Sequence, residues 1–259
     1  MRVAVLCDIH GNPPALDAVL AEAMRDGADA LVIGGDAAAG AMPRETIERL
    51  MALERPVHFV RGNADREIVE CYDRGLTAIE RLDDPALRSA AFAAGRISPA
   101  QRDFLAGFAQ TVVLELAGLG PTLFCHGSPR SDTEIITRIT PDARLREILA
   151  GVDQAVVVGG HTHQQFDRVL DRWRFVNAGS VGMPYEGTRG AYWALLGPDV
   201  ALRRTDYDVD RALAQMRGGS FPDLEEMLRE SLIEPVDPAE VAEFFEAQAT
   251  GAAPDDPDR

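Results

Sequence analysis

The 259 residues suffice for one large or two small domains, and 46% hydrophobic with 26% charged residues is typical of a folded globular chain. All 26 basic residues are arginine, which excludes mechanisms that need a P-loop, Schiff-base or kinase-type lysine. The net charge of −16 repels polyanions and argues against a sequence-blind nucleic-acid binder, although a local cation can still attract a small phosphate.

The first 60 residues alternate between predicted strands and helices. Apolar runs over 3–6, 30–33 and 57–60 predict buried strands. Asn12 is expected to cap a helix that starts with prolines, and a second helix is predicted over 43–53. This β-α-β-α-β order predicts a parallel sheet with helical crossovers. His58, inside the third strand, is interpreted as a structural residue.

The remainder of the chain changes character twice. Residues 64–109 are predicted to be helical throughout, with a clear helix start at Ser98-Pro99. Strands are then predicted over 112–116, 122–125, 155–158, 168–170, 174–176, 191–196 and 200–204. An α/β first half followed by a strand-rich half predicts two packed sheets flanked by helices. Beyond residue 208 the pattern is again helical, with prolines near two helix starts.

The cysteine pattern favours a reducing compartment. Cys7, Cys71 and Cys125 form no C-x-x-C pair and are odd in number. The apolar segment at the N-terminus is too short for a signal peptide, and the sequence has no apolar run of the roughly 20 residues that cross a membrane. We therefore expect a cytoplasmic protein without a membrane partner, in which Cys7 and Cys125 are small buried side chains.

Polar side chains follow the predicted strands at the points where the strands end. Four of the five histidines are in this position, together with two aspartates and one asparagine. The residues are Asp8, His10, Asp36, Asn63, His126, His161 and His163. In open α/β sheets the ligand crevice lies outside the carboxyl ends of the strands, so we expect these five loops to converge there.

The residue types in these loops are those of a metal site. Imidazole and carboxylate groups are preferred ligands of divalent transition metals. The D-x-H and H-x-H spacings put two side chains on one side of an extended segment. Any one of these short motifs is more often a turn or a structural histidine, but the set of seven groups is too large for one four-coordinate zinc. It suits two metals that share a carboxylate, as in phosphatases, nucleases and aminopeptidases.

The ordered set D-x-H-G-N, G-D, G-N, H-G and G-H-x-H, found between residues 8 and 163, resembles the signature of the calcineurin-like metallophosphoesterases. Residues 177–182 also resemble a segment of the small bacterial and archaeal phosphodiesterases in that family. The resemblance implies a four-layer α-β-β-α sandwich of two mixed sheets. We expect that domain over 1–207, with a helical insertion near the active site over 64–109, a helical extension over 208–249 and a disordered tail over 250–259.

The resemblance also implies which residues hold the metals. The first site would consist of Asp8, His10, Asp36 and His163. The second site would consist of Asp36, Asn63, His126 and His161, so that Asp36 bridges both. The family uses Mn, Fe, Zn, Ni or Co, and we expect two divalent ions with manganese favoured.

One position departs from the family pattern. Many members carry a histidine after the G-N pair, where it assists the leaving group, but this chain has Ala64. Arg66 and Arg130 lie beside ligand loops and are either phosphate-binding residues or members of surface ion pairs. Ser128 is not expected to be a nucleophile, because no histidine remains free to act as its base.

These observations predict a dinuclear metal-dependent phosphoesterase that hydrolyses a small phosphodiester or phosphomonoester through a metal-bridging hydroxide. Asp36, Asn63, His126 and His161 are the expected catalytic residues. The expected partner is a small phosphorylated substrate and not polymeric nucleic acid, and the oligomeric state is left open. The alternatives are a non-catalytic scaffold of the same fold and a metal-dependent nuclease acting on short oligonucleotides.

Overall fold

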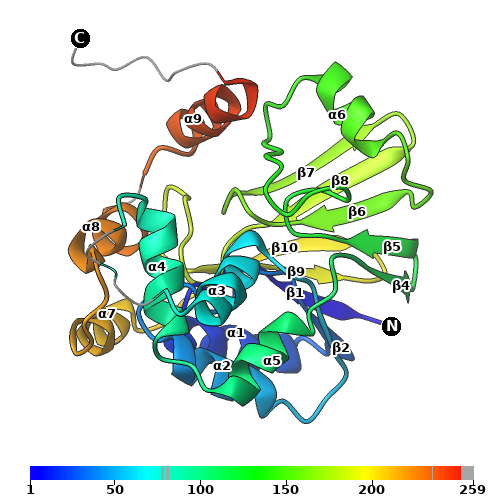
Figure 1. The fold of residues 1–259 in the computed structure, drawn as a ribbon. Helices are drawn as coiled ribbons and strands as arrows, with labels where there is room; N and C mark the ends of the chain where they lie inside the picture. Colours follow the sequence, from blue (N-terminus) through cyan, green and yellow to red (C-terminus); the bar gives the residue numbers. More distant parts are fainter. Residues whose placement is uncertain (77–78, 80–81, 235, 252–259) are drawn as a thin grey trace.

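The computed structural model describes residues 1–251 apart from 77–78, 80–81 and 235, and it contains two five-stranded sheets packed face to face (Figure 1). The first sheet has the order β10-β9-β1-β2-β3, formed by β1 (Val3–Leu6), β2 (Ala30–Ile33), β3 (Val57–Phe59), β9 (Ala191–Leu196) and β10 (Val200–Thr205). The second has the order β4-β5-β6-β8-β7, formed by β4 (Val112–Leu116), β5 (Gly120–Phe124), β6 (Val156–Gly159), β7 (Gln165–Leu170) and β8 (Trp173–Ala178).

Both sheets are mixed. In the first, β1, β2 and β3 are parallel, and β9 pairs antiparallel with β1 and β10. In the second, β5, β6 and β8 are parallel, while β4 and β7 are antiparallel edge strands. The predicted β-α-β-α-β start and the two-sheet architecture are confirmed.

The side chains of β1, which point alternately to the two faces of the sheet, show how the sequence specifies the layers. Val3 and Val5 point into the core between the two sheets, where they meet Phe124 and Val158 of the second sheet. Ala4 and Leu6 point to the opposite face and join the core formed with the helices. Because strand side chains alternate between faces, an all-apolar strand of this kind can only lie between two covered surfaces.

Helices cover the outer faces of both sheets and complete four layers (Figure 1). The first sheet is covered by α1 (Pro13–Arg25), α2 (Pro43–Met51), α3 (Asn63–Arg74), α4 (Pro85–Ala94) and α5 (Pro99–Ala106). The second sheet is covered by α6 (Asp142–Leu149). The predicted Asn12 cap is confirmed, since its side chain accepts a hydrogen bond from the Ala15 amide at 3.2 Å.

The segment predicted to be helical throughout 64–109 is divided into three helices. α3 ends at Gly75, whose φ of 64° is left-handed and stops the helix. α4 and α5 each begin with a proline after a capping side chain, from Asp84 and Ser98. Part of the first connection lies outside the described residues.

The C-terminal segment crosses from one sheet to the other. It consists of α7 (Val209–Arg217), α8 (Leu224–Leu228), a π-helical turn (Arg229–Ile233) and α9 (Pro238–Thr250). α7 and α8 form a small apolar cluster with the loop before α2, and α9 lies beside the second sheet (Figure 1). The predicted extension over 208–249 corresponds to this segment, whereas most of the tail, 252–259, lies outside the described residues.

No helix among the described residues is both long and apolar enough to span a membrane. The two cysteines predicted to be small buried side chains, Cys7 and Cys125, are each 1% exposed, which confirms that interpretation.

Candidate metal centre and its pocket

The seven predicted ligands come from loops at the carboxyl ends of parallel strands. Asp8 and His10 follow β1, and Asp36 follows β2. Asn63 begins α3 after β3, His126 follows β5, and the remaining pair, His161 and His163, follows β6. The centre therefore lies where the ends of the two sheets meet.

Two groups of side chains in these loops have the spacing of a metal site. Asp8, His10 and His163 form one group, and Asp36, His126 and His161 form the other. Within each group, one ligand atom from each residue lies within 4.8 Å of the others. The family resemblance implies two sets that contain these groups, with Asn63 added to the second and Asp36 shared by both.

Asp36, a member of the second group, also approaches the first. Its Oδ2 atom is 3.4 Å from Nε2 of His126 and 3.7 Å from Nε2 of His10. Its Oδ1 atom accepts a hydrogen bond from the Ala64 amide at 2.8 Å, which fixes the carboxylate plane. Asp8 is also central, with Oδ1 at 3.3 Å from Nε2 of His163 and 3.9 Å from Nε2 of His126.

Three of the four histidines are oriented by main-chain carbonyl groups. The Nδ1 atoms of His10, His126 and His163 lie 2.8, 2.9 and 2.7 Å from the carbonyl oxygens of Ala39, Gly34 and Met183, respectively. A ring that donates its Nδ1 proton to a carbonyl keeps a lone pair on Nε2, which is the usual arrangement of a metal-ligating histidine. The Nε2 atoms of His10 and His163 are 3.1 Å apart, so a cation between them would relieve lone-pair repulsion.

Buried polar atoms without hydrogen-bond partners also indicate a cation site. Within the described part of the chain, Asp8 Oδ1, Asn63 Oδ1 and His126 Nε2 are buried and have no hydrogen-bond partner. Leaving such atoms unpaired costs about 1–3 kcal/mol each, and more when they are charged. A divalent cation coordinated by them would remove that cost, so the residues fit the metals that the family implies.

The ionisation of the centre also favours cations. Burial lowers the pKa of His10, and burial together with His126 lowers the pKa of His161 to about 4, so both rings are neutral ligands at pH 7. Burial by itself would also lower the pKa of His126, but Asp36 and Asp8 outweigh it and raise that pKa to about 10. Burial would raise the pKa of Asp36, yet the surrounding histidines hold it below its usual range. The carboxylates that raise the pKa of His126 also attract a metal ion, which would displace the proton from that ring.

The backbone of the ligand loops is strained. Among the described residues, seven non-glycine residues have positive φ, and five of them are predicted ligands. These five are Asp8 (54°), His10 (45°), Asp36 (52°), His161 (69°) and His163 (58°). A left-handed conformation costs of order 1–3 kcal/mol and persists only where surrounding contacts enforce it, which is typical of functional sites.

Asp65 is a buried carboxylate that holds two ligand loops together. It accepts hydrogen bonds from the amides of Asp36, Ala37 and Gly62 at 2.9, 2.9 and 3.0 Å. Burial and then the charge of Asp36 raise the pKa of Asp65 to about 7. No sequence motif singled out Asp65; its position three residues after the Gly62 cap is the signal that could have identified it.

Ser180 and Asn177 position the loops that follow β1 and β6. The Ser180 hydroxyl donates to the Asp8 carbonyl at 2.7 Å and accepts from the Met183 amide at 2.8 Å. The Asn177 side chain donates to the Gly160 carbonyl at 2.6 Å, next to His161. Residues 177–182, which resemble a segment of the family, thus hold the ligand loops in place through hydrogen bonds to their main chain.

The two arginines predicted to bind phosphate are engaged elsewhere. Arg66 pairs with Asp132 at 2.8 Å, and Arg130 pairs with Glu134 at 2.6 Å. Neither lines the cavity above the ligands, so their substrate-binding role stays a prediction. Ser128 donates to Glu134 at 2.6 Å, as expected for a structural hydroxyl.

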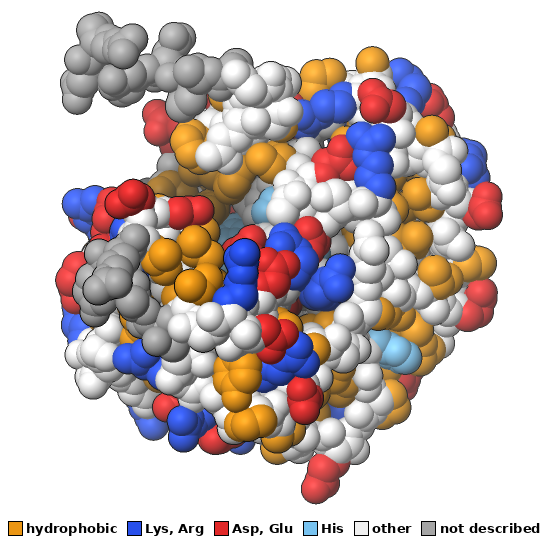
Figure 2. Space-filling view, viewed as in Figure 1, with side chains coloured by type: hydrophobic (Ala, Val, Ile, Leu, Met, Phe, Trp, Pro, Cys, Tyr) orange, Lys and Arg blue, Asp and Glu red, His pale blue; other side chains and the backbone are white. Residues whose placement is uncertain are grey.

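A cavity of about 410 Å³ opens above the two ligand groups, and Figure 2 shows a histidine at the base of the hollow. Its floor contains His10, Asp36, Asn63, His161 and His163. Ala64 also lines it and is 7% exposed, so no imidazole occupies that part of the floor. The outer walls come from α4, which belongs to the segment 64–109 expected near the active site, and from the C-terminal helices.

Comparisons with known proteins agree with this geometry. The family model described as "Calcineurin-like phosphoesterase superfamily domain" matches residues 1–197. A metallophosphoesterase from Sphaerobacter thermophilus is 25% identical, with a TM-score of 0.69 over 89% of this chain and 97% of that one. A hypothetical protein from Pyrococcus horikoshii OT3 is 22% identical, with a TM-score of 0.75 over 91% of this chain and 99% of that one. A search of curated proteins found no match.

Proposed function

The chain belongs to the calcineurin-like phosphoesterase superfamily, and we propose that it is a phosphoesterase that works with two divalent transition-metal ions. The observation that carries the proposal is the pair of ligand groups that meet at Asp36, whose Oδ2 atom lies 3.7 Å from Nε2 of His10 in the first group and 3.4 Å from Nε2 of His126 in its own. Paired divalent ions in such a site lower the pKa of a bound water and neutralise charge on a phosphoryl group.

The residues of the chain have separate tasks in this proposal. Asp8, His10 and His163 would hold one ion, and Asn63, His126 and His161 the other, with Asp36 shared. The main-chain carbonyl groups that receive the Nδ1 protons keep the rings from turning away when substrate binds. Asp65 and Ser180 maintain the spacing of the loops, so that little reorganisation is needed during the reaction.

Ala64 supports a preference among phosphoesters. A methyl group cannot donate a proton to a departing alkoxide, and a general acid contributes about 10²–10⁴-fold where the leaving group needs one. Esters whose leaving group departs as a stable anion, such as aryl phosphodiesters, should therefore be the better substrates. Manganese, a small phosphorylated partner and a location in the cytoplasm belong to the proposal as well.

The test is hydrolysis of bis(p-nitrophenyl) phosphate by protein stripped with a chelator and then supplied with Mn²⁺, Zn²⁺, Ni²⁺ or Co²⁺. We expect activity only after metal addition, and a loss of at least ~10²-fold in His126→Ala. His58→Ala is the matched control, because His58 lies in β3 away from the cavity. Equal activity before and after metal removal would contradict the proposal.

A non-catalytic scaffold and a nuclease are less well supported. A scaffold gains nothing from five strained ligand residues and buried unpaired ligand atoms, which cost stability. A nuclease needs basic side chains beside its cleft to bind the phosphates on either side of the one that it cleaves. Among the described residues that line the cavity, the only arginine is Arg88, which pairs with Asp223.

A further inference from the structure

The outer half of the cavity has a chemistry of its own. Beyond the metal-binding floor, its walls combine carboxylates of α8 and the π-helical turn with the aromatic rings of Tyr185, Phe221 and Phe245. Apolar side chains such as Met227 and the α4 residue Arg88 also line it. We propose, resting on the proposed function, that the substrate is a phosphodiester in which one alcohol carries a positive charge, such as an amino alcohol. Glu226 and Glu230 would recognise the cationic end while the phosphate lies on the floor.

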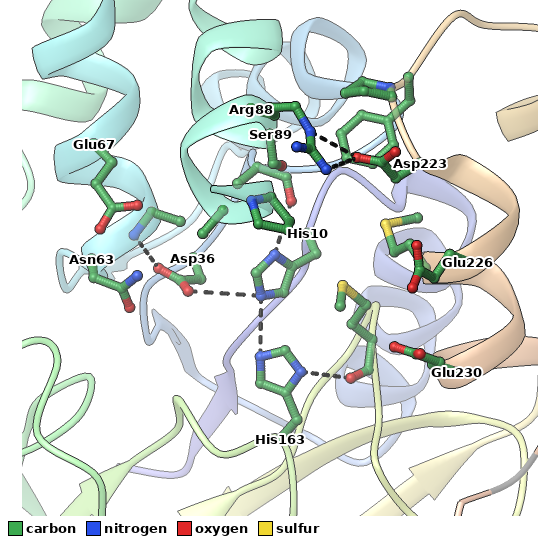
Figure 3. A pocket seen from close by; sticks show the side chains of 18 of the residues that line it. His10, Asp36, Asn63, Glu67, Arg88, Ser89, His163, Asp223, Glu226 and Glu230 are labelled. Carbon is green, nitrogen blue, oxygen red and sulfur yellow. Dashed lines mark hydrogen bonds and ion pairs between the residues drawn. The ribbon is translucent and has the colours of Figure 1, made fainter. Parts of the chain in front are cut away.

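The two carboxylates lie on one face of the C-terminal helical segment. Glu226 is in α8 and Glu230 is in the π-helical turn that continues it, and side chains four residues apart share a helix face. Both line the cavity, and Figure 3 shows both directed from the helix toward the side on which His10 and His163 lie. Their charge therefore acts on any part of a bound ligand that extends from the floor of the cavity toward these helices.

Neither carboxylate has a partner that would neutralise it. Within the described residues, no ion pair involves Glu226 or Glu230, whereas Asp223 at the same wall is paired with Arg88 at 2.9 Å. Glu67, on the α3 side of the cavity, is paired with Arg66 at 3.7 Å, so the unpaired charge lies on the side of the C-terminal helices. An unpaired acidic wall disfavours a second anionic group and favours a cation.

Aromatic rings lie beside these carboxylates. The Tyr185 ring stacks on His163 with centroids 4.9 Å apart, and Phe245 of α9 follows at 6.2 Å from Tyr185. Phe221, whose ring packs against Phe92 of α4 at 5.1 Å, also lines the cavity. Aromatic faces combined with carboxylates are the arrangement that binds ammonium groups, including quaternary ones.

The floor provides the anchor for the other end of the same ligand. Asp36, which is 4% exposed, lines the cavity, and the buried Asn63 Oδ1 atom has no hydrogen-bond partner among the described residues. These atoms belong to the candidate metal centre, so a phosphate bound there is held at one end of the cavity. The alcohol on that phosphate then extends toward the acidic wall.

The probes are two chromogenic diesters of equal shape. p-Nitrophenyl phosphorylcholine carries a trimethylammonium group, and p-nitrophenyl 3,3-dimethylbutyl phosphate replaces that group with neutral tert-butyl. With the Mn²⁺-loaded protein, we expect kcat/KM to be about tenfold higher for the cationic ester, equivalent to about 1.4 kcal/mol. Calorimetric titration with phosphorylcholine and with 3,3-dimethylbutyl phosphate gives a second readout, for which we expect the same preference.

A charge-matched pair of variants assigns the preference to the wall. In the double variant Glu226→Gln/Glu230→Gln, the ratio between the two esters and the ratio between the two affinities should fall close to one. The control is Glu240→Gln/Glu243→Gln, which removes two exposed carboxylates of α9 outside the cavity and should keep both ratios. An equal fall in both double variants would overturn the assignment, because it would show a general effect of net charge.

The outcomes separate this inference from the proposed function. If the neutral ester is hydrolysed with metal and the cationic ester is no better, the inference fails and the phosphoesterase proposal stands. If neither ester is hydrolysed, the proposed function fails for diesters, and the calorimetric preference decides whether the acidic wall recognises a cationic phosphoester. No preference for phosphorylcholine in that titration would overturn it.

Discussion

The ligand loops and the C-terminal helices build opposite sides of one cavity by different physical means. In the loops, five residues have left-handed backbone, and buried hydrogen bonds from side chains such as Asp65 and Ser180 hold them in place. In the helices, Glu226 of α8 and Glu230 of the π-helical turn are exposed side chains and have no ion-pair partner among the described residues. The loops are rigid and costly to change, whereas the helix surface can change without loss of the fold. This difference predicts that substitutions in the loops abolish activity and that substitutions in the helices alter selectivity.

Asp36→Asn should give the largest effect. The amide keeps the size of the side chain and can still accept from the Ala64 amide, but it weakens the contact with both ligand groups. We expect kcat to fall by about 10³–10⁴-fold, the upper part of the range for one catalytic group. Asn63→Ala affects one ligand group only, so its kcat should fall less. Excess Mn²⁺ should not restore the kcat of Asp36→Asn. Near-normal turnover in Asp36→Asn would show that the bridge is assigned to the wrong residue.

Ala64→His tests whether the floor lacks a proton donor. The wild type should cleave aryl phosphodiesters much better than matched alkyl esters, by about 10²-fold or more, because only the aryl leaving group departs without a proton. The histidine should narrow this ratio, provided that it fits where Ala64 is packed with 7% exposure. The measurement is kcat/KM for matched aryl and alkyl esters in both proteins. A wild type without preference would mean that departure of the leaving group does not limit the rate.

Ser180→Ala tests the support behind the loops. The hydroxyl contacts Asp8 and Met183, and the Met183 carbonyl in turn receives the Nδ1 proton of His163. We expect metal affinity to fall by about 10–100-fold, as is typical when an outer partner of a metal ligand is lost. Titration of stripped protein with Mn²⁺ measures it. Ser220→Ala, in the C-terminal segment, is the control, and equal losses in both variants would count against a specific role for Ser180.

Glu246→Ala tests the attachment of α9 and should have the smallest effect. Glu246 accepts hydrogen bonds from the Thr137 hydroxyl and from Arg144, both at 2.8 Å, and so fixes the helix that carries Phe245. We expect KM for the cationic diester to rise about 3- to 10-fold while Mn²⁺ content stays unchanged, in line with the loss of about 1 kcal/mol. Glu243→Ala, an exposed residue of the same helix, should leave KM unchanged. A loss of bound metal in Glu246→Ala would show that the two regions are not independent.

The same contrast explains what could be predicted from the sequence. The strands and the ligand positions are encoded locally, since five of the apolar runs are followed by their own histidine, aspartate or asparagine, and parallel strands bring those ends together. The role of Asp65 was missed because it depends on amides from two separate loops. The pairing of Arg66 with Asp132 was left open because the two residues are 66 positions apart. The acidic wall has no motif, since it depends on where α8 is placed in space.

The central claim is that the loops hold two metals, and the direct measurement is the metal content of the protein at saturation. Elemental analysis after reconstitution with Mn²⁺ and removal of free ions should give about two ions per chain, because the two ligand groups meet at Asp36. Asp36→Asn should give one ion or fewer under the same conditions. One ion or fewer in the wild-type protein would contradict the account, whatever its activity.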